Sequence, residues 1–151
     1  VNEKIIEPGE IVELGFTVTD GIIDEEGEQT MLGLINSERA KVGARALTWD
    51  PQAAEVARAH SKDMAAKNYF GHQNQDGLSP FERLERAGIR FKAAGENVAV
   101  VSDVENAMEG LMRSPGHRAN ILDKSFTSVG VGIYSTPANG IIVSQEFLLR
   151  R

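Results

Sequence analysis

The chain has 151 residues, of which 41% are hydrophobic and 25% charged, so it is long enough for one globular domain with a buried core. Its net charge of −6 and its lack of a concentrated basic segment exclude a nucleic-acid-binding surface, and no apolar run reaches the roughly 20 residues that a membrane-spanning helix needs. Cysteine is absent, so any fold must be stabilised without disulfides, and the redox compartment stays open.

The first thirty residues differ in charge from the rest of the chain. Residues 1–30 contain nine acidic residues and one lysine, a net charge of −8, whereas the remainder contains thirteen acidic and fifteen basic residues, a net charge of +2. We therefore predict an acidic N-terminal extension followed by the main domain at 31–151. The acidic run at 24–28 is interpreted as a solvated connector between them.

Within this extension, one segment alternates between apolar and other residues. Val12, Leu14, Phe16 and Val18 are separated by Glu, Gly and Thr, and a period of two predicts a half-buried strand. Turn signals on both sides, Pro-Gly and Asp-Gly, indicate a β-hairpin or a single strand. Such a small element cannot bury its apolar face alone, so we expect the face to dock on the main domain. The alternative is pairing with the same strand of a second molecule.

Four helices are predicted in the first part of the main domain. Their ends carry recognisable signals: Asp50 is an N-cap followed by proline, and the pairs Ser79/Glu82 and Ser102/Glu105 have the spacing of a capping box. The predicted ranges are 31–42, 51–67, 80–87 and 103–114.

The C-terminal part changes to a period of two. Val129, Val131 and Ile133 alternate with glycine and tyrosine, and the apolar run 141–147 follows an Asn-Gly turn. Two such runs predict an antiparallel hairpin. Helices combined with a small antiparallel sheet place the chain in the α+β class.

Five short motifs occur along the main domain in a fixed order. They are Y-F-G-H at 69–72, S-P-F-E-R-L at 79–84, A-G-E-N-V-A at 94–99, S-P-G-H-R-A-N-I-L at 114–122 and V-G-V-G-I-Y at 129–134. In this order they resemble bacterial CAP-domain proteins, members of the SCP/PR-1-like superfamily, over about residues 31–147. The resemblance implies a three-layer α-β-α sandwich.

Two histidines and one glutamate in these motifs are candidate metal ligands. His72 and His117 are far apart in sequence, so spacing alone does not bring them together. From the residues alone, His72 can equally be a surface-loop histidine. Alternatives also stay open for the other two: a capping or loop role for His117, and a solvent-exposed position at a sheet edge for Glu96. The resemblance implies that all three face one cleft. Because imidazole and carboxylate groups bind divalent cations, we expect a metal there, with zinc preferred.

Three further polar residues are expected to line the same cleft. They are Ser114, Asn97 and Gln145. Ser114 aligns with a second glutamate of the family, and losing that carboxylate weakens the case for a paired acid and base. Ser114 is also a conceivable nucleophile beside His117, but no nucleophile-elbow pattern surrounds it.

The third histidine is interpreted as structural. His60 falls on the same helical face as Ala53, Ala57 and Met64, a stripe typical of a core-facing helix. We therefore expect His60 to be buried, hydrogen-bonded and unimportant for metal binding.

The function implied by the resemblance is a secreted or cell-envelope module that binds a divalent cation, with a lipid or other small apolar ligand as a candidate partner. A binding role is favoured over catalysis, and no catalytic residue is assigned. The alternative is a metal-assisted hydrolase acting on a peptide, ester or glycan, because two histidines and one carboxylate also occur at catalytic zinc sites.

Overall fold

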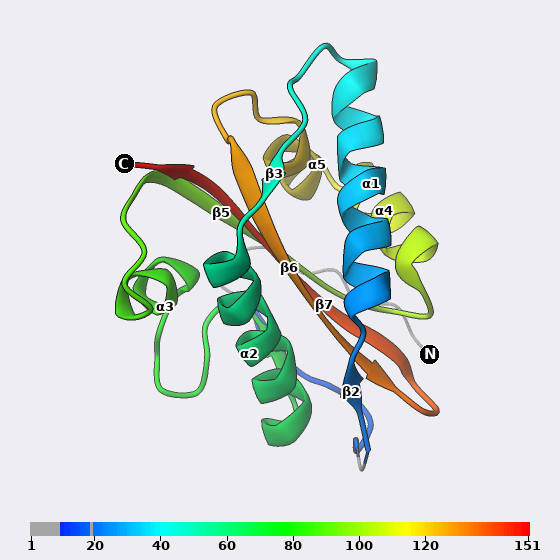
Figure 1. Cartoon of the computed structure of the whole chain (residues 1–151). Helices are drawn as coiled ribbons and strands as arrows, with labels where there is room; N and C mark the ends of the chain where they lie inside the picture. The colour runs from blue at the N-terminus through cyan, green and yellow to red at the C-terminus, as the bar shows by residue number, and fades with distance from the viewer. Residues whose placement is uncertain (1–9, 19) are drawn as a thin grey trace.

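The computed structural model describes residues 10–18 and 20–151. A twisted antiparallel sheet forms the centre, and helices cover both of its faces (Figure 1). The elements are β1 (Ile11–Glu13), β2 (Ile22–Ile23), α1 (Glu25–Lys41), β3 (Thr48–Trp49), α2 (Pro51–Lys67), β4 (Tyr69–Gly71), α3 (Pro80–Arg86), β5 (Phe91–Val101), α4 (Val104–Arg113), α5 (Pro115–Leu122), β6 (Ser128–Thr136) and β7 (Gly140–Arg150).

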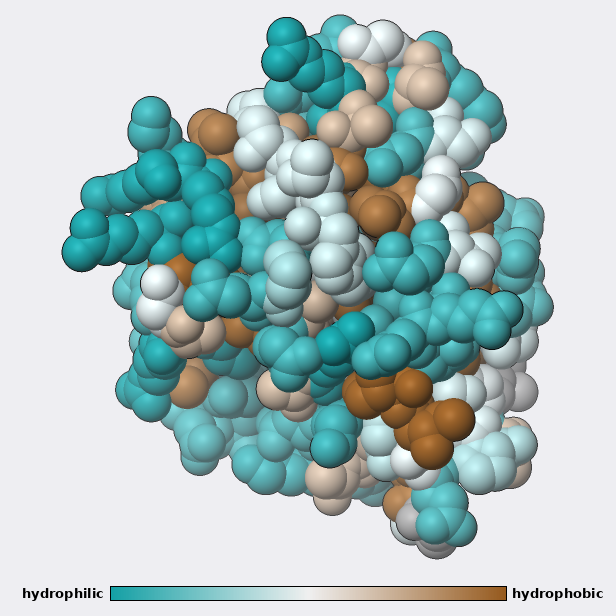
Figure 2. Space-filling view, viewed as in Figure 1, coloured by the Kyte–Doolittle hydropathy of each residue, from teal (hydrophilic) through white to brown (hydrophobic). Residues whose placement is uncertain are grey.

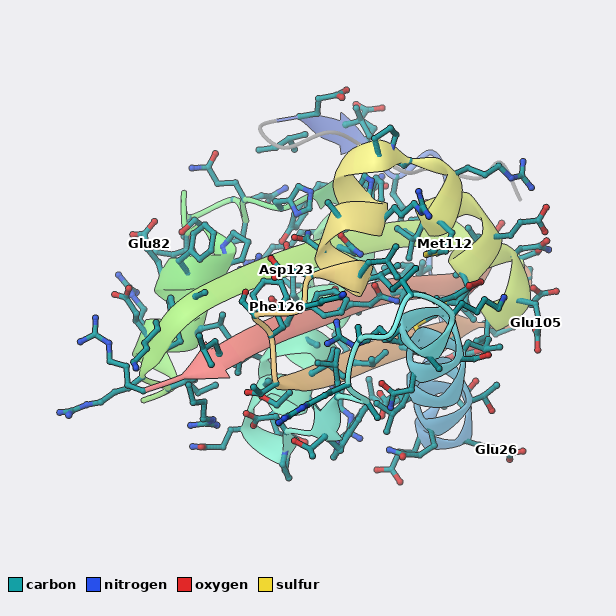
Figure 3. All side chains as sticks on the ribbon, turned by 90° about the horizontal axis from the view of Figure 1, so that it is seen from above. Glu26, Glu82, Glu105, Met112, Asp123 and Phe126 are labelled. Atoms are coloured by element: carbon teal, nitrogen blue, oxygen red, sulfur yellow. The ribbon has the colours of Figure 1, made fainter. Side chains whose placement is uncertain are left out.

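The main sheet has the strand order β2-β6-β7-β5, with β3 pairing parallel to β6, and β1 and β4 form a separate two-stranded sheet. The predicted C-terminal hairpin is confirmed as β6 and β7. Seen from above, α4 and α5 lie on one side of the sheet and α2 on the other (Figure 3). The predicted three-layer α-β-α sandwich is confirmed.

Side chains alternate strictly between these two faces. On one face, Val143 and Phe147 of β7 pack in a core with residues of α1, α4 and α5; on the other, Leu148 packs with residues of α2 and α3. On the α2 face, a Cβ added at Gly130 or Gly132 would lie 2.1 or 2.2 Å from the helix backbone. The V-G-V-G motif therefore lets α2 approach the sheet closely.

The predicted helix starts are confirmed at α2 and α3. Asp50 caps α2 by accepting from two backbone N–H groups, and Ser79 and Glu82 form the reciprocal capping box of α3. At α4 the prediction is one residue off, because Asp103 is the N-cap and accepts from Asn106 N at 2.8 Å.

The acidic run at 24–28 is not a connector, which corrects that interpretation. Asp24 caps α1, and the helix begins at Glu25, six residues earlier than predicted. Glu28 is fully buried, where its carboxylate accepts three hydrogen bonds from Arg58 and one from Ile133 N. The acidic pattern was misleading because one of its carboxylates, Glu28, is buried with a distant partner, the half-buried Arg58 of α2.

The N-terminal segment docks on the chain's own domain. The alternation in burial from Val12 to Val18 is as predicted, and Leu14 is fully buried in a cluster with Phe70 of β4. The strand itself is shorter than predicted: its pairing with β4 ends at Glu13, and Gly15 has a left-handed φ of 88°. No hairpin joins β1 to β2, because β2 pairs with β6.

The surface seen in Figure 2 is mainly hydrophilic, with a hydrophobic patch over β2, where Ile22 is 71% exposed. Among the residues that the structure describes, no helix is both long and apolar enough to span a membrane.

Candidate functional site

The candidate site lies at the free edge of the main sheet, where β5 is the last strand. Glu96 and Asn97 are neighbours on this strand, so their side chains point to opposite faces. Glu96 faces the side of α2 and α3, and Asn97 faces the side of α5. Residues from both helical layers can therefore meet around this edge.

A buried polar cluster forms around Glu96. Its carboxylate is 2.9 Å from His72 Nδ1 and accepts hydrogen bonds from Arg83 Nη2 at 3.1 and 3.3 Å. Arg83 also donates to the backbone carbonyl of His72. The guanidinium of α3 thus fixes both the carboxylate and the loop that carries the histidine.

A second buried glutamate lies directly beside the first. Glu146 of β7 is paired with Glu96 in the strand register, and neither residue's side chain is more than 1% exposed. Burial, together with the negative charge of Glu96, raises the pKa of Glu146 well above its usual range. For Glu96, burial acts in the same direction but is outweighed by Glu146, His60, Arg83 and His72, which lower its pKa. Of the two carboxyls, Glu146 is therefore the one that holds a proton to the higher pH.

His117 reaches the same place from the other helical layer. It lies in the first turn of α5, and its Nδ1 is 2.7 Å from the hydroxyl of Ser114. The rings of His72 and His117 are stacked, with centroids 6.4 Å apart and planes 21° apart. The structure thus brings together the two histidines that the resemblance placed in one site.

Asn97 and Gln145 do not line an open cleft, which corrects that prediction. Both are fully buried beneath α5. Asn97 Nδ2 donates to the His117 carbonyl and to Gln145 Oε1, and its own Oδ1 accepts from Asn120. Their role is to hold α5, and with it His117, against the sheet.

The predicted three-ligand set is not present as such. Within residues 10–18 and 20–151, no three His, Cys, Asp or Glu side chains are arranged to hold a metal ion. The oxygens of Glu96 are instead engaged by Arg83 and by His72 Nδ1. The donors that fit a cation are the two imidazoles: His72 Nε2 is buried and makes no hydrogen bond to a described residue. Glu96 instead orients the His72 ring.

His60 is buried, as predicted, and its Nε2 donates to the Gly71 carbonyl at 2.7 Å. The sequence interpretation missed Arg83 and Glu146. Glu146 carried the same signal as Glu96, a carboxylate inside an otherwise apolar strand. For Arg83 no local signal existed, because its partners lie on other elements.

Comparison with known proteins agrees with this architecture. The profile of the CAP family, described as the cysteine-rich secretory protein family, matches residues 32–147. The chain belongs to the CAP family.

Two proteins of Bacillus subtilis (strain 168) are similar in sequence. YkwD, which is uncharacterized, is 41% identical over 122 residues, covering 80% of this chain and 46% of its own. YlbC, an uncharacterized membrane protein, is 37% identical over 135 residues, covering 83% of this chain and 39% of its own. The chain thus spans less than half the length of these two relatives.

Solved structures show the same fold. An extracellular protein with an SCP domain from Bacillus anthracis has a TM-score of 0.78 and 37% identity, with coverage of 84% of this chain and 41% of that one. An outer surface protein of Borrelia burgdorferi has a TM-score of 0.81 at 19% identity, covering 87% and 100% of the two chains, a likeness of fold alone.

Proposed function

We propose that this chain is an extracellular or cell-envelope binding module in which His72 and His117 hold a divalent cation, with Zn²⁺ preferred. The observation that carries the proposal is the orientation of the two rings. Nδ1 of His72 is taken by Glu96 and Nδ1 of His117 by Ser114, while Nε2 of His72 is buried beside the second ring without a hydrogen-bond partner among the described residues. Such outer partners fix the ring orientation and tautomer of metal-binding histidines.

A cation held by two imidazoles leaves coordination positions for an external ligand. A binding role suits this site better than hydrolysis, because Glu96 is held by Arg83 and Glu146 is fully buried with a raised pKa, so neither carboxyl is a solvated general base. The extracellular location is supported by the Bacillus anthracis relative, itself described as extracellular. A lipid or other small apolar ligand is a second proposed partner, and binding of a fluorescent fatty acid tests it.

Calorimetry with Zn²⁺ tests the metal proposal. We expect the wild-type protein to bind and the variants His72→Ala and His117→Ala to lose about tenfold or more in affinity, the usual scale for damage to a metal site. His60→Ala is the matched control, because it removes an imidazole that faces Gly71 instead. Equal zinc affinity in all four proteins would contradict the proposal.

A measurement of turnover distinguishes the hydrolase alternative from the binding module. The hydrolase requires metal-dependent turnover of a peptide, ester or glycan that His117→Ala abolishes. A binding module shows zinc affinity with no turnover of any of the three.

A further inference from the structure

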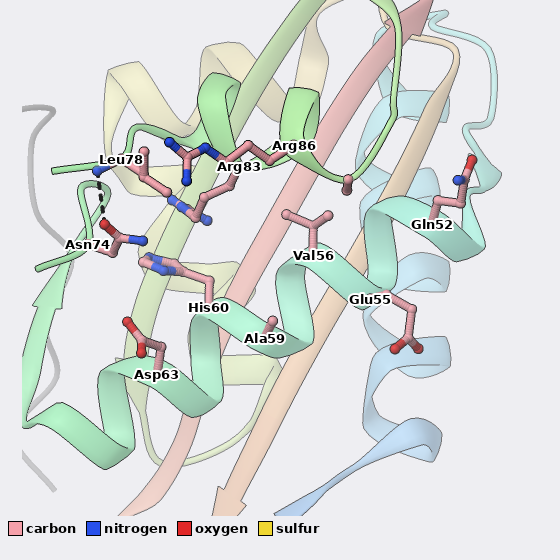
Figure 4. Close-up of a pocket in the computed structure, with 11 residues that line it drawn as sticks. Gln52, Glu55, Val56, Ala59, His60, Asp63, Asn74, Leu78, Arg83 and Arg86 are labelled. Carbon is pink, nitrogen blue, oxygen red and sulfur yellow. Dashed lines mark hydrogen bonds between the residues drawn. The ribbon is translucent and has the colours of Figure 1, made fainter. Parts of the chain in front are cut away.

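A groove of about 610 Å³ lies between α2 and α3, and Arg83 and His60 are among the residues that line it (Figure 4). Its volume is in the range of small-ligand pockets. None of the residues of the proposed cation site lines it. The residues that line it are Gln52, Glu55, Val56, Ala59, His60, Asp63, Asn74, Leu78, Arg83, Arg86 and Ala87.

The α3 wall of this groove offers hydrogen-bond donors without acceptors. The Arg83 side chain is only 9% exposed, and its Nη2 pairs with Glu96 while its Nη1 lies 3.9 Å from Glu146 Oε2; Nε and Nη1 make no hydrogen bond to a described residue. One turn later Arg86 is exposed and makes no hydrogen bond or ion pair within the described part of the chain. Figure 4 shows both side chains extending from α3 towards His60. Two guanidinium groups converging in this way suit an anionic oxygen ligand.

The α2 wall offers an acceptor. His60 Nε2 must carry the proton, because it lies 2.7 Å from the Gly71 carbonyl oxygen, which only accepts. Burial lowers the pKa of His60, which favours the neutral ring, and in that tautomer Nδ1 carries a lone pair. This nitrogen is buried and has no partner among the described residues. A ligand N–H would satisfy it.

The other residues that line the groove limit the size and charge of a ligand. Val56, Ala59 and Leu78 give the groove an apolar stretch, and the loop that carries Leu78 is held in place by a bond from Leu78 N to Asn74 Oδ1 at 2.9 Å. Glu55 and Asp63 on α2 bring negative charge to the rim. They disfavour a multiply charged anion, such as a phosphate, relative to a monoanion.

We propose that this groove binds the C-terminal residue of a peptide that ends in an apolar side chain. The terminal carboxylate lies between Arg83 and Arg86, the amide N–H of the same residue donates to His60 Nδ1, and the side chain packs on Val56 and Leu78. A peptide C-terminus combines the three features that the walls demand: one negative charge, one adjacent N–H donor and one apolar group.

Three small probes that differ by one feature test the proposal. N-acetyl-leucine carries all three features, N-acetyl-leucinamide lacks the charge, and 4-methylpentanoate lacks the N–H. Titrations followed by amide chemical shifts, in the presence of a chelator, should show N-acetyl-leucine binding about tenfold more tightly than either analogue, the order expected for one charge-assisted or buried hydrogen bond. The shifts should centre on residues of α2 and α3.

Variants locate the site. Arg86→Gln removes an exposed guanidinium without a described partner and should weaken N-acetyl-leucine binding about tenfold. Ala59→Leu fills the groove at a helical position that tolerates leucine, and should weaken it as well. Arg90→Gln, at an exposed arginine outside the groove, is the matched control and should leave affinity unchanged.

Failure of the groove proposal can be distinguished from failure of the zinc proposal, because His117→Ala should lose affinity for zinc and keep its affinity for N-acetyl-leucine. Equal binding of the acid and its amide, unchanged affinity in Arg86→Gln, or no binding at about 10 mM would overturn the proposal. Equal binding of 4-methylpentanoate would overturn the assignment to a peptide and leave a simple carboxylic acid as the ligand class.

Discussion

Adjacent residues of β5 show two opposite ways of burying polar groups. Asn97 joins a network in which its own amide, Gln145, Asn120 and the His117 carbonyl are all hydrogen-bonded. One residue earlier, Glu96 joins a cluster in which many polar atoms make no hydrogen bond, although Arg83 Nη1 and Glu146 Oε2 form an ion pair at 3.9 Å. Of the seven buried side-chain atoms without a hydrogen bond in the described chain, all but Ser128 Oγ belong to that cluster: His60 Nδ1, His72 Nε2, Arg83 Nε and Nη1, and Glu146 Oε1 and Oε2.

This difference in hydrogen bonding distinguishes a structural role from a functional one. Buried polar groups are normally satisfied, and a fully satisfied network stabilises one arrangement of the chain. The Asn97 face therefore positions α5. Unsatisfied groups gathered in one place indicate a site that meets something outside the chain. The Glu96 face therefore holds both the proposed cation site and the groove beside it.

The largest expected effect is on the satisfied face. Asn97→Ala removes three hydrogen bonds at a fully buried position, among them the one that Asn97 donates to the His117 carbonyl. We expect the free energy of unfolding to fall by about 2–4 kcal/mol. Urea denaturation measures this free energy. A loss smaller than that caused by His60→Ala would contradict the view that the Asn97 face contributes more to stability than the Glu96 face.

On the other face, His60→Ala removes one hydrogen bond, to Gly71 of β4. The expected loss of stability is about 1–3 kcal/mol. Zinc affinity should be unchanged. Thermal unfolding measures the loss of stability, and calorimetry on the same sample measures zinc affinity. An unchanged melting temperature combined with lost zinc binding would assign His60 to the cation site instead.

Glu146→Gln should change the pH dependence of stability more than stability itself. In the folded protein Glu146 keeps its proton to a higher pH than in the unfolded chain, because burial and Glu96 raise its pKa. Wild-type stability therefore decreases as pH rises above the usual glutamate pKa, by at most about 1.4 kcal/mol per pH unit, and the amide removes this loss.

The measurement is the melting temperature of both proteins at pH 5 and pH 8. The variant should gain relative to the wild type at pH 8. Glu105→Gln, at an exposed glutamate, is the control and should show no such gain. A constant difference between wild type and Glu146→Gln at both pH values would mean that Glu146 is not the protonated partner.

The smallest effect concerns the N-terminal segment, which packs on the α2 side of the molecule. Because Leu14 and its neighbours dock on the chain's own domain, we expect the full chain to be monomeric in light scattering. Deleting residues 1–18 uncovers the apolar surface around Phe70 and should increase association. A full-length dimer that becomes monomeric on deletion would instead favour strand pairing between molecules.

Local patterns were sufficient for much of the fold. The caps of α2 and α3, the β6–β7 hairpin and the alternation from Val12 to Val18 depend on neighbours within a few residues, so the sequence predicted them well. The motif order led to the family and hence to the layers. Element ends were less predictable where a distant partner intervened, as Arg58 does for Glu28 in α1.

For the candidate site, too, the sequence predicted some features and not others. Residue types and motifs identified His72, His117 and Glu96, because imidazoles and a carboxylate in unusual surroundings can be recognised from the sequence alone. Their roles depended on contacts between segments that are distant in the sequence: Arg83 donates to the oxygens of Glu96, and Glu146, with a raised pKa, lies beside it on the next strand. Only the folded sheet edge decides which groups are paired, because hydrogen bonding and burial are properties of neighbours in space.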